Sequence, residues 1–172
     1  MAHINKQLKD IFLILIIFSA SISASNASSN LSNCEEKPSV YIISPQNGFV
    51  SDSNNVKVIF GSKNVEINPA GKGEIATKKC FASGHHHLLV NIDQLPESFI
   101  PFDEGYYHFG GGQTEVILDL EPGTYSLQLI LGSYVHNSRM QVNNFAGQGP
   151  FTSEKITIKV NFLKIRPSSF YR

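Results

Sequence analysis

The sequence predicts an all-β protein, built as a single immunoglobulin-like antiparallel β-sandwich of about seven or eight strands. From residue 40 onward, short runs rich in β-branched and aromatic residues alternate with Gly, Pro and Asn clusters, as sandwich strands alternate with their turns. No helical period competes with this pattern after the first 27 residues. The expected strands are residues 40–44, 56–60, 65–68, 86–92, 114–120, 124–131 and 154–162.

The N-terminal region has the features of a secretory signal peptide. Lys6 and Lys9 precede an apolar stretch at residues 11–18, and small residues suited to cleavage follow it. The stretch is shorter than the roughly 20 residues of a spanning helix, so we expect export to the periplasm or beyond, with no membrane span after cleavage. An uncleaved anchor is the alternative. The expected division is a signal peptide at 1–27, a flexible leader at 28–37, the sandwich domain at 38–164 and a C-terminal tail at 165–172.

The composition fits one globular domain and excludes one class of partner. The chain has 172 residues, of which 41% are hydrophobic, and its formal net charge is zero. No basic stripe interleaved with aromatic residues is present, so the electrostatic footprint of a nucleic-acid binder is missing. We therefore expect no nucleic acid among its partners.

Cys34 and Cys80 are the two cysteines of the sequence. An even pair in an exported protein favours a disulfide over free thiols. Such a disulfide would close a loop of 47 residues (34–80). Closing this loop would stabilise the fold by about 4 kcal/mol through chain entropy. Two separate buried thiols are the alternative.

A tyrosine follows the turn at residues 121–123. Tyr125 comes just after the Pro-Gly pair of this turn and at the start of a strand, like the tyrosine whose hydroxyl anchors a corner of Greek-key sandwiches. The alternative is a plain core tyrosine on the face that it shares with Leu127. Leu127 stands where antibody domains carry a cysteine, so the cross-sheet disulfide of those domains is absent.

Residues 84–92, Gly-His-His-His-Leu-Leu-Val-Asn-Ile, hold half of the six histidines. Side chains alternate along a strand, so His85 and His87 share one face, whereas His86 shares the other with Leu88. Two imidazoles two residues apart project in parallel, which lets both reach one metal ion. His86 is expected to be a hydrogen-bonded histidine of the core.

Two further histidines complete the candidate site. His108 precedes the three glycines at 110–112, which we interpret as a shaped loop that delivers this histidine, and His136 lies in a later loop. With the pair on the strand they predict a metal site made of His85, His87, His108 and His136. The alternative is a polar patch of histidines that titrates near pH 6.5.

The ligand type narrows the metal to copper(II) or zinc, because imidazole suits these ions. A blue-copper centre is disfavoured, because it needs a cysteine thiolate and both cysteines are expected to form the disulfide. A methionine-rich copper(I) carrier is excluded, because the only methionines are Met1 and Met140. Only neutral imidazole ligates, so we expect metal affinity to fall as the pH drops through about 6.5.

The sequence favours a binding protein over an enzyme. It has no Gly-x-Ser-x-Gly elbow and no His-Glu-x-x-His helix. A superoxide dismutase also carries a His-x-His strand on a β-sandwich and is the enzyme alternative, although the metal-bridging carboxylate of such an enzyme is not evident. The alternative from another class is a non-catalytic module that recognises a protein or glycan partner through its histidine and Gly-Gln-Thr-Glu loops.

Several motifs together resemble those of a known family. They are Pro69-Ala-Gly71, Gly84-His-His-His-Leu-Leu89, His108-Phe-Gly-Gly-Gly-Gln-Thr-Glu115, Pro122-Gly123 and Ser153-Glu-Lys-Ile156. In this order they are similar to the bacterial exported domain of unknown function 4399, over about residues 40–160. The resemblance implies an exported bacterial β-domain and brings no established activity.

The chain departs from the family pattern at Asn91 and Ser133, which stand where the pattern has aspartates. Carboxylates beside metal-bound histidines orient them and raise their basicity, so we expect a weaker site here than in relatives. Gln113, Glu115 and Asn91 remain candidates for hydrogen bonds that orient the ligands.

Overall fold

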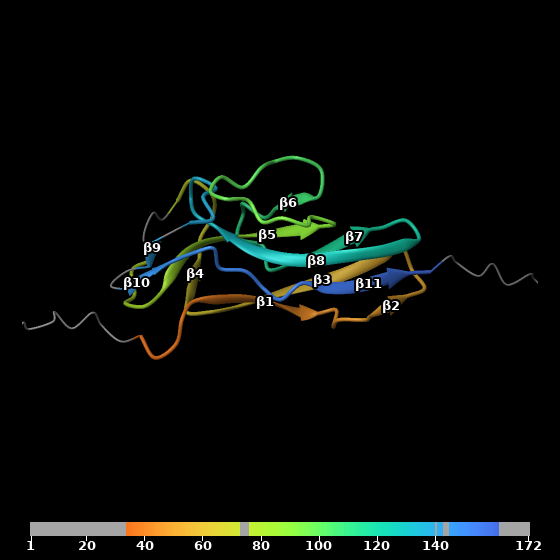
Figure 1. Ribbon diagram of the computed structural model, residues 1–172, viewed down its shortest axis with the longest axis horizontal. Coiled ribbons are helices and arrows are strands. Elements are labelled where there is room, and N and C mark those ends of the chain that lie inside the picture. Colours follow the sequence, from red (N-terminus) through yellow and green to blue (C-terminus); the bar gives the residue numbers. More distant parts are fainter. Residues whose placement is uncertain (1–33, 73–75, 140, 143–144, 162–172) are drawn as a thin grey trace, which may run out of the picture. The chain divides into compact units, whose positions relative to one another are not determined.

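The computed structural model describes residues 34–72, 76–139, 141–142 and 145–161. All named secondary-structure elements in these ranges are β-strands (Figure 1). The strands are β1 (Ser39–Ser44), β2 (Val50–Ser51), β3 (Asn55–Lys63), β4 (Val65–Ile67), β5 (Ala82–Val90), β6 (Tyr106–His108), β7 (Glu115–Asp119), β8 (Gly123–Gly132), β9 (Gln141–Val142), β10 (Phe145–Gln148) and β11 (Ile156–Val160). The predicted all-β class is confirmed.

Several expectations fall on other parts of the chain. The predicted signal peptide at 1–27, the first residues of the predicted leader and the predicted tail at 165–172 lie outside the described residues. Within the described ranges, no helix is long and apolar enough to cross a membrane.

The strands form a three-stranded, a six-stranded and a two-stranded sheet. The first has the order β1-β3-β7, and the second has the order β2-β11-β8-β5-β4, with β6 also paired to β5. The β2–β11 and β4–β5 pairs are parallel, so the six-stranded sheet is mixed rather than purely antiparallel. The sequence pattern did not reveal β2, β6, β9 and β10, because strands of two to four residues are too short for a readable alternation.

One hydrophobic core joins the three-stranded and the six-stranded sheets. Alternate residues of β3 and β8 supply much of it: Val56, Val58, Phe60, Leu127, Leu129 and Leu131. Burying a side chain of this size stabilises the fold by about 1.5–3 kcal/mol. Leu88 of β5 faces the same core, whereas its neighbour Leu89 packs against Ile100 and Ile130 on the opposite face. Strand β5 is therefore buried on both faces, and this strand positions the site.

Strand β5 begins and ends earlier than the predicted 86–92. It starts at Ala82 because β4 pairs in parallel with residues 82–84, a long-range contact that the local pattern does not reveal. It ends at Val90 because Asn91 adopts a φ of 56°, in the left-handed region that breaks a strand. The Asn91 side chain holds this bend, since its Oδ1 accepts a hydrogen bond from the N–H of Ser126 at 2.9 Å.

Two predicted anchors are confirmed. The hydroxyl of Tyr125 donates to the carbonyl oxygen of Glu121 at 2.7 Å, which is the hydrogen bond of a tyrosine corner. Its ring also packs against the core, so the two interpretations of this tyrosine are compatible. Cys34 and Cys80 form a disulfide, with their Cα atoms 5.7 Å apart, and this bond ties the segment before β1 to the start of β5.

Candidate metal centre

Strand β5 carries the inner half of the cluster. His85 and His87 lie on one face of this strand, and both side chains are fully buried. The strand pairs with β8, which places Gly132 opposite His85 and Ile130 opposite His87. Figure 1 shows the two strands running side by side. The predicted pairing of these two histidines on one face is confirmed.

His86 points the other way, into the core between the sheets. Its ring centroid lies 5.3 Å from that of Phe60, and its Nδ1 lies 3.4 Å from the carbonyl oxygen of Gln113. The side chain is fully buried. The prediction of a core histidine that faces away from the pair is confirmed.

His108 is the last residue of β6 and stands directly opposite His87 in the ladder between β5 and β6. The N–H of Phe109 donates to the carbonyl oxygen of His86 at 3.1 Å, which extends this pairing past the end of the strand. The sequence predicted that a loop would deliver His108. A short strand delivers it instead, because the free edge of β5 offers backbone groups with which residues 106–108 can pair.

His136 lies in a turn that follows β8. Its φ is 61°, and its N–H donates to the carbonyl oxygen of Ser133 at 2.9 Å. Its own carbonyl oxygen accepts a hydrogen bond from the N–H of Ile100 at 2.8 Å. A residue with a side chain keeps a left-handed conformation only where its surroundings impose it. These two hydrogen bonds hold the turn that carries the imidazole.

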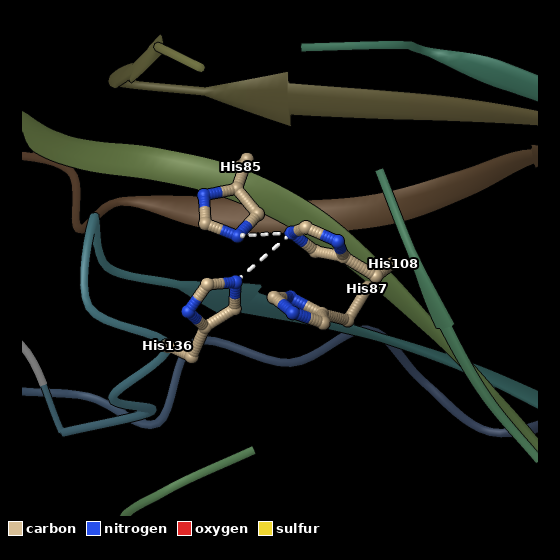
Figure 2. A group of neighbouring side chains, drawn as sticks. All are labelled: His85, His87, His108 and His136. Carbon is tan, nitrogen blue, oxygen red and sulfur yellow. Dashed lines mark hydrogen bonds between the residues drawn. The ribbon is translucent and has the colours of Figure 1, made fainter. Parts of the chain in front are cut away.

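The four histidines converge on one point, as Figure 2 shows. Nε2 of His108 lies 3.2 Å from Nε2 of His85 and 3.0 Å from Nε2 of His136, and one ring nitrogen from each of the four lies within 4.8 Å of the others. At metal–nitrogen distances of about 2.0–2.1 Å, two tetrahedral ligands lie roughly 3.3 Å apart. The two separations at Nε2 of His108 match this value, and the other separations, up to 4.8 Å, would have to shorten when an ion binds.

The buried ring nitrogens of the inner pair are poorly satisfied. Nδ1 of His85 and both ring nitrogens of His87 make no hydrogen bond of good geometry to any described protein group. A buried polar group left in this way costs about 1–3 kcal/mol. An ion at the centre of the cluster would offset this cost at one nitrogen of His87, whereas His85 faces the other rings with its Nε2 and its Nδ1 would stay unpaired.

Burial keeps the inner imidazoles neutral. Desolvation, followed by the neighbouring imidazoles, lowers the pKa of His87 from 6.5 to about 3 and the pKa of His85 to about 4. The pKa values of His108 and His136 are also lowered, chiefly by desolvation. Because neutral imidazole is the form that binds a metal ion, the cluster is ready to ligate at neutral pH.

Two exposed phenylalanines border the outer histidines, and sequence reasoning missed them. The ring of Phe102 lies 4.7 Å from that of His136 and 5.4 Å from that of His108, and the ring of Phe99 lies 6.0 Å from that of Phe102. Phe99 is 54% exposed and Phe102 is 59% exposed. The available signal was the apolar run Phe99-Ile-Pro-Phe102 in a segment otherwise rich in acidic and polar residues.

The three residues proposed to orient the ligands form their side-chain bonds elsewhere. Oε1 of Gln113 accepts from the N–H of Gly111 at 2.9 Å, and Glu115 pairs with Lys57 at 3.0 Å on the exposed side of the three-stranded sheet. Oδ1 of Asn91, just past the end of β5, accepts a hydrogen bond from the N–H of Ser126 in β8. Each of these contacts holds a turn or a strand pair, and none of these side-chain bonds goes to one of the four clustered imidazoles.

The donor set of the cluster is made only of nitrogen. Among the described residues, no carboxylate and no thiol belongs to the group that could hold an ion, and both cysteines are in the disulfide. Two of the four histidines are buried and two are accessible, so the group could hold a metal ion near the protein surface.

A comparison with known protein families identifies one match. Residues 58–161 match a family described as a domain of unknown function (DUF4399). The matched region runs from within β3 to the residue after β11 and includes all four clustered histidines. No curated protein and no solved structure matches the chain. The resemblance predicted from the motifs is confirmed.

Proposed function

The chain belongs to the DUF4399 family, whose function is not known, and from its histidine cluster we propose that it is a metal-binding module. It holds one divalent transition-metal ion through His85, His87 and at least one of His108 and His136. In this role the protein binds the ion and does not catalyse a reaction.

A single observation carries this proposal. Four imidazoles from three separate segments of the chain bring one nitrogen each to within 4.8 Å of one another. His87 is buried, and neither of its ring nitrogens makes a hydrogen bond of good geometry to a described group, which is unfavourable unless something else satisfies one of these atoms. The lowered pKa values of His85 and His87 mean that a second proton does not bind these rings near neutral pH.

Copper(II) and zinc are the proposed ions. Imidazole ligands suit both, and an all-nitrogen site that imposes no geometry binds copper(II) more tightly than zinc. The disulfide removes both thiols from consideration, which disfavours copper(I) and a blue-copper centre.

We also propose that the protein acts outside the cytoplasm and that its domain is an immunoglobulin-like sandwich. The disulfide supports an oxidising compartment, as does the signal-like pattern of residues 1–27. The tyrosine corner and the core shared by two sheets support the sandwich assignment.

A second candidate function is a docking module for a protein or glycan partner. The exposed Phe99 and Phe102 favour it, because neighbouring exposed aromatic rings are typical of interaction sites. A superoxide-dismutase-like enzyme is less favoured, since the described cluster lacks the carboxylate that such an enzyme uses to hold its metal.

Isothermal titration calorimetry of the tag-free domain tests the proposal. At a pH of about 7.5, where the imidazoles are neutral, we expect one copper(II) or zinc ion per chain and a rise in melting temperature with bound metal. The matched control is the His85→Ala/His87→Ala variant, which keeps the outer pair. Neither heat nor thermal stabilisation with copper(II), zinc or nickel would contradict metal binding and leave the docking module as the better account.

A further inference from the structure

Two glycines lie directly against ligand rings of the cluster. A Cβ atom built on Gly110 would lie 2.3 Å from Cε1 and 2.5 Å from Nε2 of His108. A Cβ atom built on Gly132 would lie 2.4 Å from Cε1 and 2.8 Å from Nδ1 of His87. Real Cβ atoms do not approach other atoms so closely, so each imidazole occupies space that any other residue would fill.

The backbone conformation does not by itself require glycine at these two positions. Gly112, in the same loop as Gly110, has a φ of 82°, which favours glycine on conformational grounds, whereas Gly110 and Gly132 do not adopt a positive φ. Their missing side chains therefore serve close packing rather than backbone freedom.

Residues 69–71 hold the outer parts of the site in place. The N–H of Ala70 donates to the carbonyl oxygen of Gly110 at 2.8 Å, and the N–H of Gly71 donates to the carbonyl oxygen of Tyr134 at 3.1 Å. One short segment thus bonds the loop that follows His108 and the turn that carries His136. The Cβ of Ala70 also lies 3.2 Å from the position that a Cβ on Gly110 would take, so the Gly110 backbone has little room to move away.

We infer that Gly110 and Gly132 are positioning residues of the metal centre, which make the space in which the imidazoles of His108 and His87 reach the common point. The inference rests on the proposed function, and it extends that function to residues that do not touch the ion. It also assigns a role to the Pro-Ala-Gly and Gly-Gly-Gly motifs, since the first holds the second against His108.

The decisive test is a double-mutant cycle on metal affinity. Gly110→Ala should lower the affinity for copper(II) or zinc by about 10- to 100-fold, the range typical of residues that orient ligands. In a His108→Ala background the same change should have no further effect, because its target ring is gone. Gly111→Ala is the matched control, since the three atoms nearest to its Cβ, at 3.1–3.2 Å, all belong to the flexible side chain of Gln113. Equal losses for Gly110→Ala in both backgrounds, or no loss in the wild-type background, would overturn the inference.

A measurement on the metal-free protein separates this inference from the proposed function. In the wild type we expect a nuclear Overhauser contact between Hε1 of His108 and the Hα atoms of Gly110, and we expect Gly110→Ala to displace the ring and remove the contact to residue 110. Absence of the contact in the wild type would overturn the inference. If the contact is present but no metal binds, the proposed function fails while the packing of the ring on the glycine stands.

The role of Gly132 is tested by adding a methyl group at this position and then removing the His87 ring that the methyl group would meet. Gly132→Ala should lower the melting temperature of the metal-free domain, because the new methyl group meets His87 in a buried position. His87→Ala should recover most of that loss when it is combined with Gly132→Ala. An unchanged loss in the combined variant would remove Gly132 from the inference.

Discussion

The inner and outer histidines of the cluster are held in different ways. His85 and His87 lie on one nine-residue strand that is buried on both faces, with β8 on one edge and β4 and β6 on the other. His108 ends a three-residue strand, and His136 lies in a turn whose shape depends on hydrogen bonds to distant segments. The inner pair is fully buried, whereas the outer pair is accessible.

This difference predicts that the two pairs affect different properties of the site, namely the affinity for the metal ion and the rate at which the ion enters and leaves. A buried strand fixes its side chains in single rotamers, so the inner pair forms the rigid part of the site. The outer pair is accessible and is held by a few backbone hydrogen bonds and by contact with an exposed ring, so we expect it to adjust more readily than the inner pair. We expect the inner ligands to dominate metal affinity and the outer ligands to govern entry and release.

The largest expected effect comes from His87→Ala. It removes a buried ligand whose ring lies 4.8 Å from that of His85 and 5.1 Å from that of His108, so metal affinity should fall by roughly 100-fold or more, more than loss of a residue that only orients a ligand. Calorimetric titration with copper(II) and zinc measures the change. Retention of wild-type affinity would mean that the inner pair is not the foundation of the site.

Acidification should act on the inner pair at a lower pH than the sequence suggested. Because desolvation lowers the pKa of His85 to about 4 and that of His87 to about 3, protons compete with metal at these ligands well below 6.5. The outer histidines, whose pKa values are lowered without such deep burial, should protonate first. Metal affinity measured from pH 7.5 down to about 3 should therefore fall in two stages. A single loss centred at 6.5 would contradict the difference between the pairs.

The same shifts predict the stability of the metal-free domain. In the unfolded chain each histidine binds a proton near pH 6.5, whereas the buried histidines of the folded chain do not, so the unfolded state gains protons first as the pH falls. Stability is therefore complete above about 6.5 and is lost as the pH falls toward 4 and below, with each unit of pKa difference contributing about 1.4 kcal/mol. Urea unfolding at several pH values checks the sign. A metal-free domain that becomes more stable on acidification would contradict it.

His108→Ala should have a smaller effect than His87→Ala. The buried pair His85 and His87 would remain together with His136, so affinity should fall by about 10- to 100-fold while the bound ion exchanges faster. Competition with a chromophoric chelator in a stopped-flow instrument measures both quantities. An affinity loss equal to that of His87→Ala would remove the distinction between inner and outer ligands.

Phe102→Ala should change release more than affinity. Its ring contacts both outer histidines and is not itself a ligand, so its loss should raise the rate of metal release a few-fold with little change in stability. The same stopped-flow competition measures the rate. The solvent-exposed Tyr41→Ala, on the three-stranded sheet, serves as a control for loss of an exposed ring.

The smallest effect on metal should come from His86→Leu. This residue lies on the core side of β5, so affinity should stay within about twofold, while stability changes by about 0.5–3 kcal/mol as the contact with the Gln113 carbonyl is lost. Calorimetric titration and chemical unfolding of the same preparation give both values. Loss of metal binding without a change in stability would contradict the observed strand register.

The sequence by itself determined the features that depend on neighbouring residues. A strand alternates its side chains with a period of two, so the two faces of the triple histidine could be read without a structure. A Pro-Gly turn followed by a strand tyrosine was enough to predict the corner bond of Tyr125, and two cysteines allow only one intramolecular pairing. Each of these follows from geometry or counting along the chain.

Only the tertiary structure decided how the site closes. His108 reaches the cluster through pairing with a strand about twenty residues earlier, and His136 reaches it through the bond between its carbonyl oxygen and Ile100. The partners of Gln113 and Glu115, the place of Phe102 and the space beside Gly110 also depend on segments that are distant in sequence. Such contacts leave no periodic signal, because they are selected by the packing of whole elements rather than by the preference of any one stretch.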